Sequence, residues 1–192
     1  MGFFGKIIRR LKFQRWSSFK ADVYPMKISP FDGHRLVNTR VSNTCSLVSM
    51  EHLNIQDNVF IGHFNFIEAS NGITIEEGCQ ITNYISIITH SSHISIRLYG
   101  KQYAGLDMKG YVKGSVCIGK YTFIGPHSVI MPGTKIGKGS IVSAYSMVKG
   151  DFPEFSIIAG NPAKVVGNTR NIDGPFLQAN PELRTFYEEW AK

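Results

Sequence analysis

Branched apolar residues recur at every sixth position through the middle of the chain. They form two runs, Ile55, Ile61, Ile67, Ile75, Ile81 and Ile87, then Ile118, Ile124, Ile130, Ile136, Val142 and Val148, with one two-residue slip before Ile75. Ile and Val make up only 34 of the 192 residues, so chance explains this pattern poorly. A six-residue unit is too short for a helix and a turn, and it suits one short strand and one corner.

Small residues complete the repeating unit. In the second run a Thr or Ser stands four residues after each of the first five anchors, and Phe152 closes the series: Thr122, Ser128, Thr134, Ser140 and Ser146. Glycine often follows an anchor directly, where we expect it to relieve backbone strain at a corner. Three units would close a triangular coil, and anchors of successive coils would stack about 4.8 Å apart. The pattern therefore predicts an all-β parallel solenoid over residues 23–155, with Val41, Leu47 and Leu53 in an early, less regular coil.

The repeat has one large interruption. Ile118 comes 31 residues after Ile87, although the period of the repeat is six. This difference predicts an inserted loop at about 93–115. Long loops on rigid scaffolds are usually functional. Tyr99, Tyr103 and Tyr111 in this loop could bind substrate by stacking on a sugar ring, or could pin the loop to the scaffold. Residues 156–192 are expected to form a tail and a short helix that caps an open end of the solenoid.

Charge is concentrated at the start of the chain. The formal net charge is +7, and residues 1–20 hold six basic residues and no acid. We interpret residues 1–22 as a basic amphipathic segment, whose residues 1–16 could lie on an anionic membrane surface or dock on a protein surface. Charges interrupt its apolar residues, so neither a signal peptide nor a membrane span is expected there. The nearly neutral remainder disfavours nucleic acid as a partner.

Three widely spaced cysteines, Cys45, Cys79 and Cys117, show neither a disulfide framework nor a metal-binding knuckle. They indicate free thiols in a reducing compartment, and we expect a cytoplasmic protein, peripheral at the inner face of the membrane if residues 1–16 bind there.

The hexads, the loop that begins near THSSH and the ending AGNPAKVVG together resemble the hexapeptide-repeat acyltransferases, most closely sugar and polysaccharide O-acetyltransferases of the galactoside/maltose acetyltransferase type. The resemblance covers roughly residues 40–168. It implies a left-handed parallel β-helix, a homotrimer with sites between neighbouring chains, acetyl-CoA as acyl donor and no required metal. The implied activity is acetyl transfer to a hydroxyl of a sugar or surface polysaccharide intermediate.

Acetyl transfer to a hydroxyl needs a base, and a neutral imidazole serves near pH 7. His90 stands three residues after Ile87, where the chain leaves the coil, and it matches the departure point at which the family places its catalytic histidine. His93 is the other candidate, and whichever is not the base would orient the substrate or the base.

The resemblance also implies where coenzyme A binds. The pantetheine groove would include Gly125, Ser143 and Ala144, and the AGNPAKVVG ending contributes Asn161, Pro162 and Lys164. Lys164 matches the family's basic position near the nucleotide phosphates, and Lys149 is a second candidate. The family's oxyanion amide falls on Pro126, which has no N–H, so Gly125 or another loop amide would have to replace it.

Three other functions remain open. An N-acetyltransferase acting on a nucleotide-linked amino sugar would use the same machinery. A zinc hydratase on the same coil would need three converging imidazoles, and the chain offers only the close pair His90 and His93. A non-catalytic scaffold would leave the inserted loop and its histidines without a role.

Overall fold

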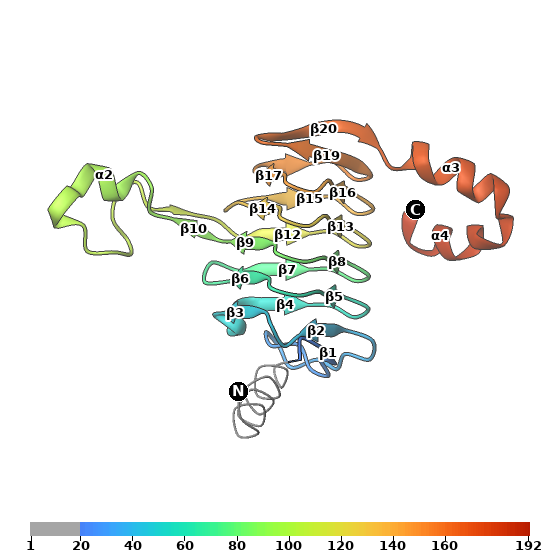
Figure 1. Ribbon diagram of the computed structural model, residues 1–192, viewed down its shortest axis with the longest axis horizontal. Helices are drawn as coiled ribbons and strands as arrows, with labels where there is room; N and C mark the ends of the chain where they lie inside the picture. Colours follow the sequence, from blue (N-terminus) through green and yellow to red (C-terminus); the bar gives the residue numbers. More distant parts are fainter. Residues whose placement is uncertain (1–19) are drawn as a thin grey trace, which may run out of the picture.

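The computed structural model describes residues 20–192, which form a three-sided β-solenoid with an arm on one side and two helices on another (Figure 1). Each coil contributes one short strand to each of three parallel faces. The first face contains β2 (Arg40–Ser42), β5 (Phe60–Ile61), β8 (Gln80–Ile81), β13 (Phe123–Ile124), β16 (Ile141–Val142) and β19 (Ser156–Gly160). The second contains β3 (Ser46–Val48), β6 (Phe66–Glu68), β9 (Ser86–Ile88), β14 (Val129–Ile130) and β17 (Met147–Val148). The third contains β4 (Leu53–Ile55), β7 (Ile73–Ile75), β12 (Val116–Ile118), β15 (Lys135–Ile136) and β18 (Asp151–Phe152).

The sixth-residue anchors form the core, as predicted. In the first face Ile61 pairs with Ile81, Ile81 with Ile124 and Ile124 with Val142, and the other two faces carry equivalent ladders. None of the twelve anchors is more than 2% exposed. Each coil therefore buries its three anchors against those of the coils before and after it, and this stacking sets the register of the whole solenoid.

The small polar residues of the repeat are buried at the corners. Ser128 Oγ donates a hydrogen bond to the Ser143 carbonyl (3.1 Å), and Thr122 Oγ1 donates to the Gly137 carbonyl (3.3 Å). These side chains satisfy backbone carbonyls that the turn leaves free, which is why a small hydroxyl residue occupies this position.

The two ends of the solenoid differ from the simple repeat. At the start, β1 (Val23–Pro25) pairs antiparallel with β2. At the other end the coil continues beyond the expected boundary at residue 155, because β19 pairs in parallel with β16. It is then followed by β20 (Ala163–Asn168), which runs antiparallel to β19.

The C-terminal helices lie beside the stack (Figure 1). They are α3 (Arg170–Ala179) and α4 (Arg184–Ala191), joined by the 3-10 turn η3 (Pro181–Leu183). The Trp190 ring of α4 stacks on Tyr121 and Phe155, with centroids 4.5 and 5.9 Å apart, and both partners belong to corners between the third and first faces. The helix expected to cap an open end thus covers corners along the side, and β20 lies over the last coil of the first face.

The large insertion forms an arm. It begins with β10 (His90–Ser91), continues through α2 (Ser95–Tyr99) and the 3-10 turn η2 (Gly100–Gln102), and returns through β11 (Val112–Lys113). The strands pair antiparallel, with His90 opposite Lys113, and the arm projects well away from the solenoid (Figure 1). Its two ends meet at the coil, where the Gly114 N–H donates to the Thr89 carbonyl (3.0 Å).

The proposed membrane or docking segment, residues 1–16, lies outside the described residues. Within residues 20–192, no helix has both the length and the apolar character needed to cross a bilayer.

Candidate active site

A buried carboxylate occupies the corner where the arm leaves the coil. Glu68 directly follows the anchor Ile67, and only 5% of its surface is exposed. Its Oε1 accepts a hydrogen bond from the Ser70 N–H (2.8 Å), and its Oε2 accepts from the Thr89 N–H (3.2 Å) and hydroxyl (2.9 Å). Burial by itself raises the pKa of Glu68, but the donors of Ser70 and Thr89 outweigh it and hold the pKa at about 2. The group is therefore a carboxylate at neutral pH.

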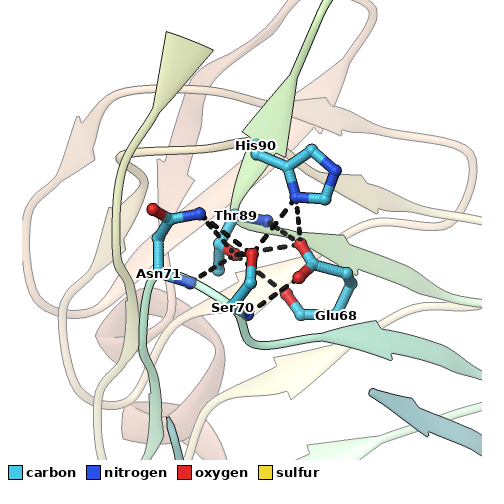
Figure 2. A network of polar contacts seen from close by, with 5 residues as sticks. All are labelled: Glu68, Ser70, Asn71, Thr89 and His90. Carbon is cyan, nitrogen blue, oxygen red and sulfur yellow. Dashed lines mark hydrogen bonds and ion pairs between the residues drawn. The ribbon is translucent and has the colours of Figure 1, made fainter. Parts of the chain in front are cut away.

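This carboxylate holds His90 in a defined orientation. His90 Nδ1 lies 2.7 Å from Glu68 Oε2, with Ser70 Oγ 3.3 Å away, and the histidine side chain is 34% exposed. An ionised carboxylate can only accept, so Nδ1 carries the proton and Nε2 keeps its lone pair. Figure 2 shows Nε2 on the side of the ring that faces away from the network. An oriented, partly exposed imidazole with a free Nε2 has the properties of a general base.

Further polar contacts tie the site to two successive coils. The Asn71 N–H donates to Thr89 Oγ1 (3.0 Å), and Asn71 Nδ2 donates to Ser70 Oγ (3.0 Å), as Figure 2 shows. Glu68, Ser70 and Asn71 belong to one coil, and Thr89 and His90 to the next. Because adjacent coils are locked by the anchor ladder, the carboxylate and the imidazole share one rigid frame.

Glu68 is not among the site residues predicted from the sequence. The signal was present, because Ile67 and Ile87 are stacked anchors, and the residues that follow them must then be neighbours as well. In the structure Glu68 pairs with Ile88, one residue before Thr89. Extending the anchor register to the flanking residues would have placed this acid beside His90.

The two candidate histidines occupy different environments. His93 lies on the arm and is exposed, its Nδ1 is 2.8 Å from Ser91 Oγ, and its carbonyl accepts a hydrogen bond from Arg97. Neither contact supplies a carboxylate partner. His90 therefore has the arrangement expected for a base, and His93 lies beyond that network.

The three tyrosines of the arm also make different contacts. The Tyr111 ring stacks on the His90 ring, with centroids 5.5 Å apart and planes 12° from parallel. The Tyr99 hydroxyl accepts a hydrogen bond from the Lys109 N–H (3.2 Å), which ties the two sides of the arm together. Tyr103 is half-buried within the arm, where its N–H donates to the Gly100 carbonyl.

Most of the candidate coenzyme-binding residues lie at a different corner. Gly125, Ser143, Ala144, Asn161 and Pro162 fall where the first face turns into the second, or in the turn beyond β19. Lys164 is an exposed residue of β20, opposite Ala159. Only Lys149 shares the corner of His90, two coils further along. A single chain therefore does not bring His90 and the groove candidates together.

The amide of Gly125 is already engaged. Its N–H donates to the Val142 carbonyl (2.8 Å), so it is not free to stabilise an oxyanion in this structure. A Cβ at this position would lie 2.6 Å from the Ala144 nitrogen, so close contact between coils requires glycine here. Of the two replacements expected for the amide missing at Pro126, Gly125 is therefore engaged within the coil, and another loop amide stays a prediction.

Comparison with known proteins identifies the family. The model for "Bacterial transferase hexapeptide (six repeats)" matches residues 117–150. A dTDP-4-amino-4,6-dideoxy-D-glucose acyltransferase from Escherichia coli is 30% identical over an alignment of 150 residues that covers 67% of this chain and 78% of that protein. The chain belongs to the hexapeptide-repeat acyltransferases. The resemblance inferred from the repeat, the loop and the AGNPAKVVG ending is thereby confirmed.

Other members of the family are similar over shorter stretches. WbbJ from Escherichia coli K12, named as an O-acetyl transferase of lipopolysaccharide biosynthesis, is 32% identical over 113 residues. The chain spans 57% of the length of WbbJ.

Solved structures show the same fold. The hexapeptide-repeat acetyltransferase VCA0836 from Vibrio cholerae, solved with acetyl coenzyme A, has a TM-score of 0.58 at 21% identity, over 70% of this chain and 68% of that one. AntD, an N-acyltransferase from Bacillus cereus solved with dTDP and 3-hydroxybutyryl-CoA, has a TM-score of 0.55 at 22% identity, over 75% and 89% of the two chains. The all-β solenoid predicted from the sequence is therefore the fold of this family.

No group of three or more His, Cys, Asp or Glu side chains within residues 20–192 is arranged to hold a metal ion. The pair His90 and His93 thus has no third ligand in the part of the chain that the structure describes.

Proposed function

We propose that the protein is an acetyl-CoA-dependent O-acetyltransferase that acetylates a hydroxyl of a sugar or a surface polysaccharide intermediate. The observation that carries this proposal is the contact between His90 Nδ1 and the Glu68 carboxylate (2.7 Å) at the base of the arm. Membership of an acyltransferase family supports the reaction type, and the likeness to WbbJ supports a hydroxyl acceptor.

His90 acts as the general base in the proposed reaction. Its Nε2 takes the proton of the acceptor hydroxyl while the hydroxyl oxygen attacks the thioester carbon. The tetrahedral intermediate then collapses, the carbon–sulfur bond breaks, and the thiolate of coenzyme A takes the proton back from the imidazolium. Glu68 is ionised throughout the reaction. Before the first step it fixes the His90 tautomer that carries its proton on Nδ1, and after that step it stabilises the imidazolium.

A second copy of the chain completes the proposed site. The resemblance assigns coenzyme A to Gly125, Ser143 and Ala144, with Lys149 and Lys164 for its phosphates, and to the turn at Asn161 and Pro162. Most of these residues lie across the second face from His90, at another corner of the triangular coil. In the homotrimer that the resemblance implies, the groove of one chain meets the arm of its neighbour.

An alternative acceptor is the amine of a nucleotide-linked sugar. The similarity to the E. coli dTDP-4-amino-4,6-dideoxy-D-glucose acyltransferase favours it, because this chain covers 78% of that protein. A neutral amine attacks a thioester with less help from a base than a hydroxyl needs, so this reaction would depend less on His90.

Release of the coenzyme A thiol tests the proposal. Acetyl-CoA is offered with hydroxyl-only sugars and glycans, and separately with a dTDP-linked amino sugar. Because a general base contributes about 100-fold or more, we expect His90→Ala to lose at least that factor on the hydroxyl acceptors. His93→Ala, on the same arm, is the matched control and should stay within about threefold.

Two outcomes contradict the proposal. Full activity of His90→Ala on every hydroxyl acceptor excludes it as the base. Transfer confined to the amino sugar replaces O-acetylation by N-acetylation.

A further inference from the structure

The arm places an aromatic ring against the proposed base. Antiparallel pairing sets Lys113 opposite His90 and Val112 opposite Ser91, so the returning chain passes directly beside the histidine. Tyr111, the residue before β11, lays its ring on the imidazole at 5.5 Å and 12° from parallel. The sequence leaves open whether Tyr111 stacks on a sugar ring or pins the loop to the scaffold, and in the structure one face of its ring contacts His90.

We propose that Tyr111 is a positioning residue that holds the His90 ring in the plane where Nδ1 reaches Glu68 and Nε2 faces the acceptor. This inference rests on the proposed function of His90 as the base. It makes the arm part of the catalytic frame, since the arm must be paired through β10 and β11 for Tyr111 to reach the ring.

The geometry of His90 explains why such a support is needed. The second side-chain torsion of histidine has broad minima, and the contact with Glu68 fixes only one ring atom. The ring can still pivot about that atom, or turn over and present Nε2 to the carboxylate. With about a third of the side chain exposed, the protein around His90 does not enclose the ring completely. A parallel aromatic ring opposes rotation of the imidazole out of its plane, including passage through the perpendicular orientation that turning over requires, without occupying either nitrogen.

The contact is made by the ring of Tyr111 and not by its hydroxyl. No hydrogen bond joins this hydroxyl to any of residues 20–192. Burial, followed by the nearby Tyr103 and Glu68, raises the pKa of Tyr111, so the phenol stays neutral beside the carboxylate. Lys113 Nζ lies 5.6 Å from the Tyr111 ring centroid and is itself paired with Asp107. The ring of Tyr111 therefore has a cation–π contact in addition to its stack on His90.

Substitutions at Tyr111 separate positioning from substrate binding. Tyr111→Phe keeps the stacked ring, and Tyr111→Leu removes it. Tyr99→Leu is the matched control, because Tyr99 lies on the same arm and contacts Lys109 instead of His90. Nitrogen-15 NMR of the imidazoles reports the tautomer of His90 without any substrate, and His90→Gln assigns its signals.

The expected results differ sharply between the variants. Wild type, Tyr111→Phe and Tyr99→Leu should show a single neutral tautomer of His90, protonated at Nδ1. Tyr111→Leu should show a mixture of the two tautomers. Because a small misplacement of a reacting group is costly, we expect its kcat to fall about 10-fold at an unchanged KM for acetyl-CoA, and Tyr111→Phe to stay within about twofold of wild type.

Three results overturn the inference. The first is a Tyr111→Leu variant with the wild-type tautomer. The second is a rise in acceptor KM alone, which assigns Tyr111 to sugar binding. The third is an equal tautomer change in Tyr99→Leu, which would show that any loosening of the arm suffices. The NMR result stands even if wild-type protein acetylates no hydroxyl acceptor, and that failure counts against the proposed function alone.

Discussion

Two residues from successive coils divide the work at the candidate active site. Glu68 is buried and ionised, with its pKa held at about 2 by the donors of Ser70 and Thr89. His90 is partly exposed, and its Nε2 lies on the side of the ring away from the polar network (Figure 2). The coil backbone thus supplies a fixed negative charge beside the imidazole, because Glu68 remains ionised throughout the neutral range.

Neutralising the carboxylate tests this division. Glu68→Gln keeps the size of the side chain but removes the charge that fixes the tautomer and stabilises the imidazolium. We expect kcat for transfer to a hydroxyl acceptor to fall by at least about 10-fold. Glu77→Gln is the control, because Glu77 is a more exposed acid that pairs with Lys120 at another corner. Wild-type kcat in Glu68→Gln would remove Glu68 from the mechanism.

The same carboxylate predicts a pH-dependent contribution to stability. Its pKa is about 2 in the folded chain against an ordinary value of 4.5, so the folded state favours the ionised form. The resulting stabilisation is fully present above pH 4.5 and is lost as pH falls toward 2. This difference between the unfolded and folded pKa of Glu68 corresponds to a stabilisation on the order of 3 kcal/mol.

Urea unfolding of wild type and Glu68→Gln at pH 7, 4.5 and 3 measures this contribution. The difference in the free energy of unfolding should shrink as the pH is lowered through this range. A difference that does not change with pH would show that Glu68 stabilises the fold by shape alone.

The sequence revealed only part of the site. His90 was recognisable because it follows an anchor at the point where the period breaks. Glu68 lies 22 residues earlier, and it becomes recognisable only when the stacking of the anchors Ile67 and Ile87 is extended to the residues that follow them. The contact of Tyr111 depends on strand pairing within the arm, for which the sequence carries no periodic signal. The role of Tyr111 and the roles of the coenzyme-binding residues stay predictions.

The glycines that follow the anchors are needed for another reason than the one predicted from the repeat. Gly119, Gly125 and Gly137 do not have a positive φ; their Cβ atoms would instead come within 2.4 to 2.6 Å of backbone atoms in the next coil. The positive φ values at corners belong to other residues, including His127 (59°) and Tyr145 (60°). The expectation that the glycines after the anchors relieve strain is wrong, because close coil packing selects them.

A pair of glycine variants checks this reason. In Gly119→Ala the new methyl meets the Lys138 nitrogen at 2.6 Å, and the crowded backbone has little room to move, so we expect a loss of about 1 to 3 kcal/mol. Gly174 lies in α3, where a Cβ would meet only its chain neighbours, including the ring of Pro175, so Gly174→Ala should change the free energy of unfolding by less than about 1 kcal/mol. Urea denaturation measures both, and equal effects of the two substitutions would contradict the packing argument.

The ends of the solenoid were the elements least accessible to sequence analysis. The anchors fixed the three faces and their order, because burial of a branched side chain at a period of six leaves few alternatives. Neither β1 nor β20 carries a hexad, and each joins the first face by antiparallel pairing. The position of α4 depends on the Trp190 contacts with Tyr121 and Phe155, residues that are far from it in the sequence.

At the scale of the whole molecule, the triangular cross-section separates His90 from most of the groove candidates. The two groups lie on different corners with the second face between them. A complete site in the proposed assembly must therefore combine the arm of one chain with the groove of another.

Mixing two inactive variants tests this arrangement. His90→Ala lacks the base, and Ala144→Trp places a bulky ring in the proposed pantetheine groove. If sites form between neighbours, chains co-expressed in equal amounts should regain about a quarter of wild-type transfer, because about one interface in four then combines an intact base with an intact groove. Each variant alone is the control, and no recovery in mixed oligomers would place base and groove on one chain.

The hydrogen bond that joins Gly114 to Thr89 bears on the length of the arm. It closes the coil beneath the arm, so the scaffold meets the same two endpoints whatever lies between them. The entropic cost of a longer excursion grows only with the logarithm of its length. The coil can therefore carry a projecting segment of another length or sequence without a change in the register of its strands.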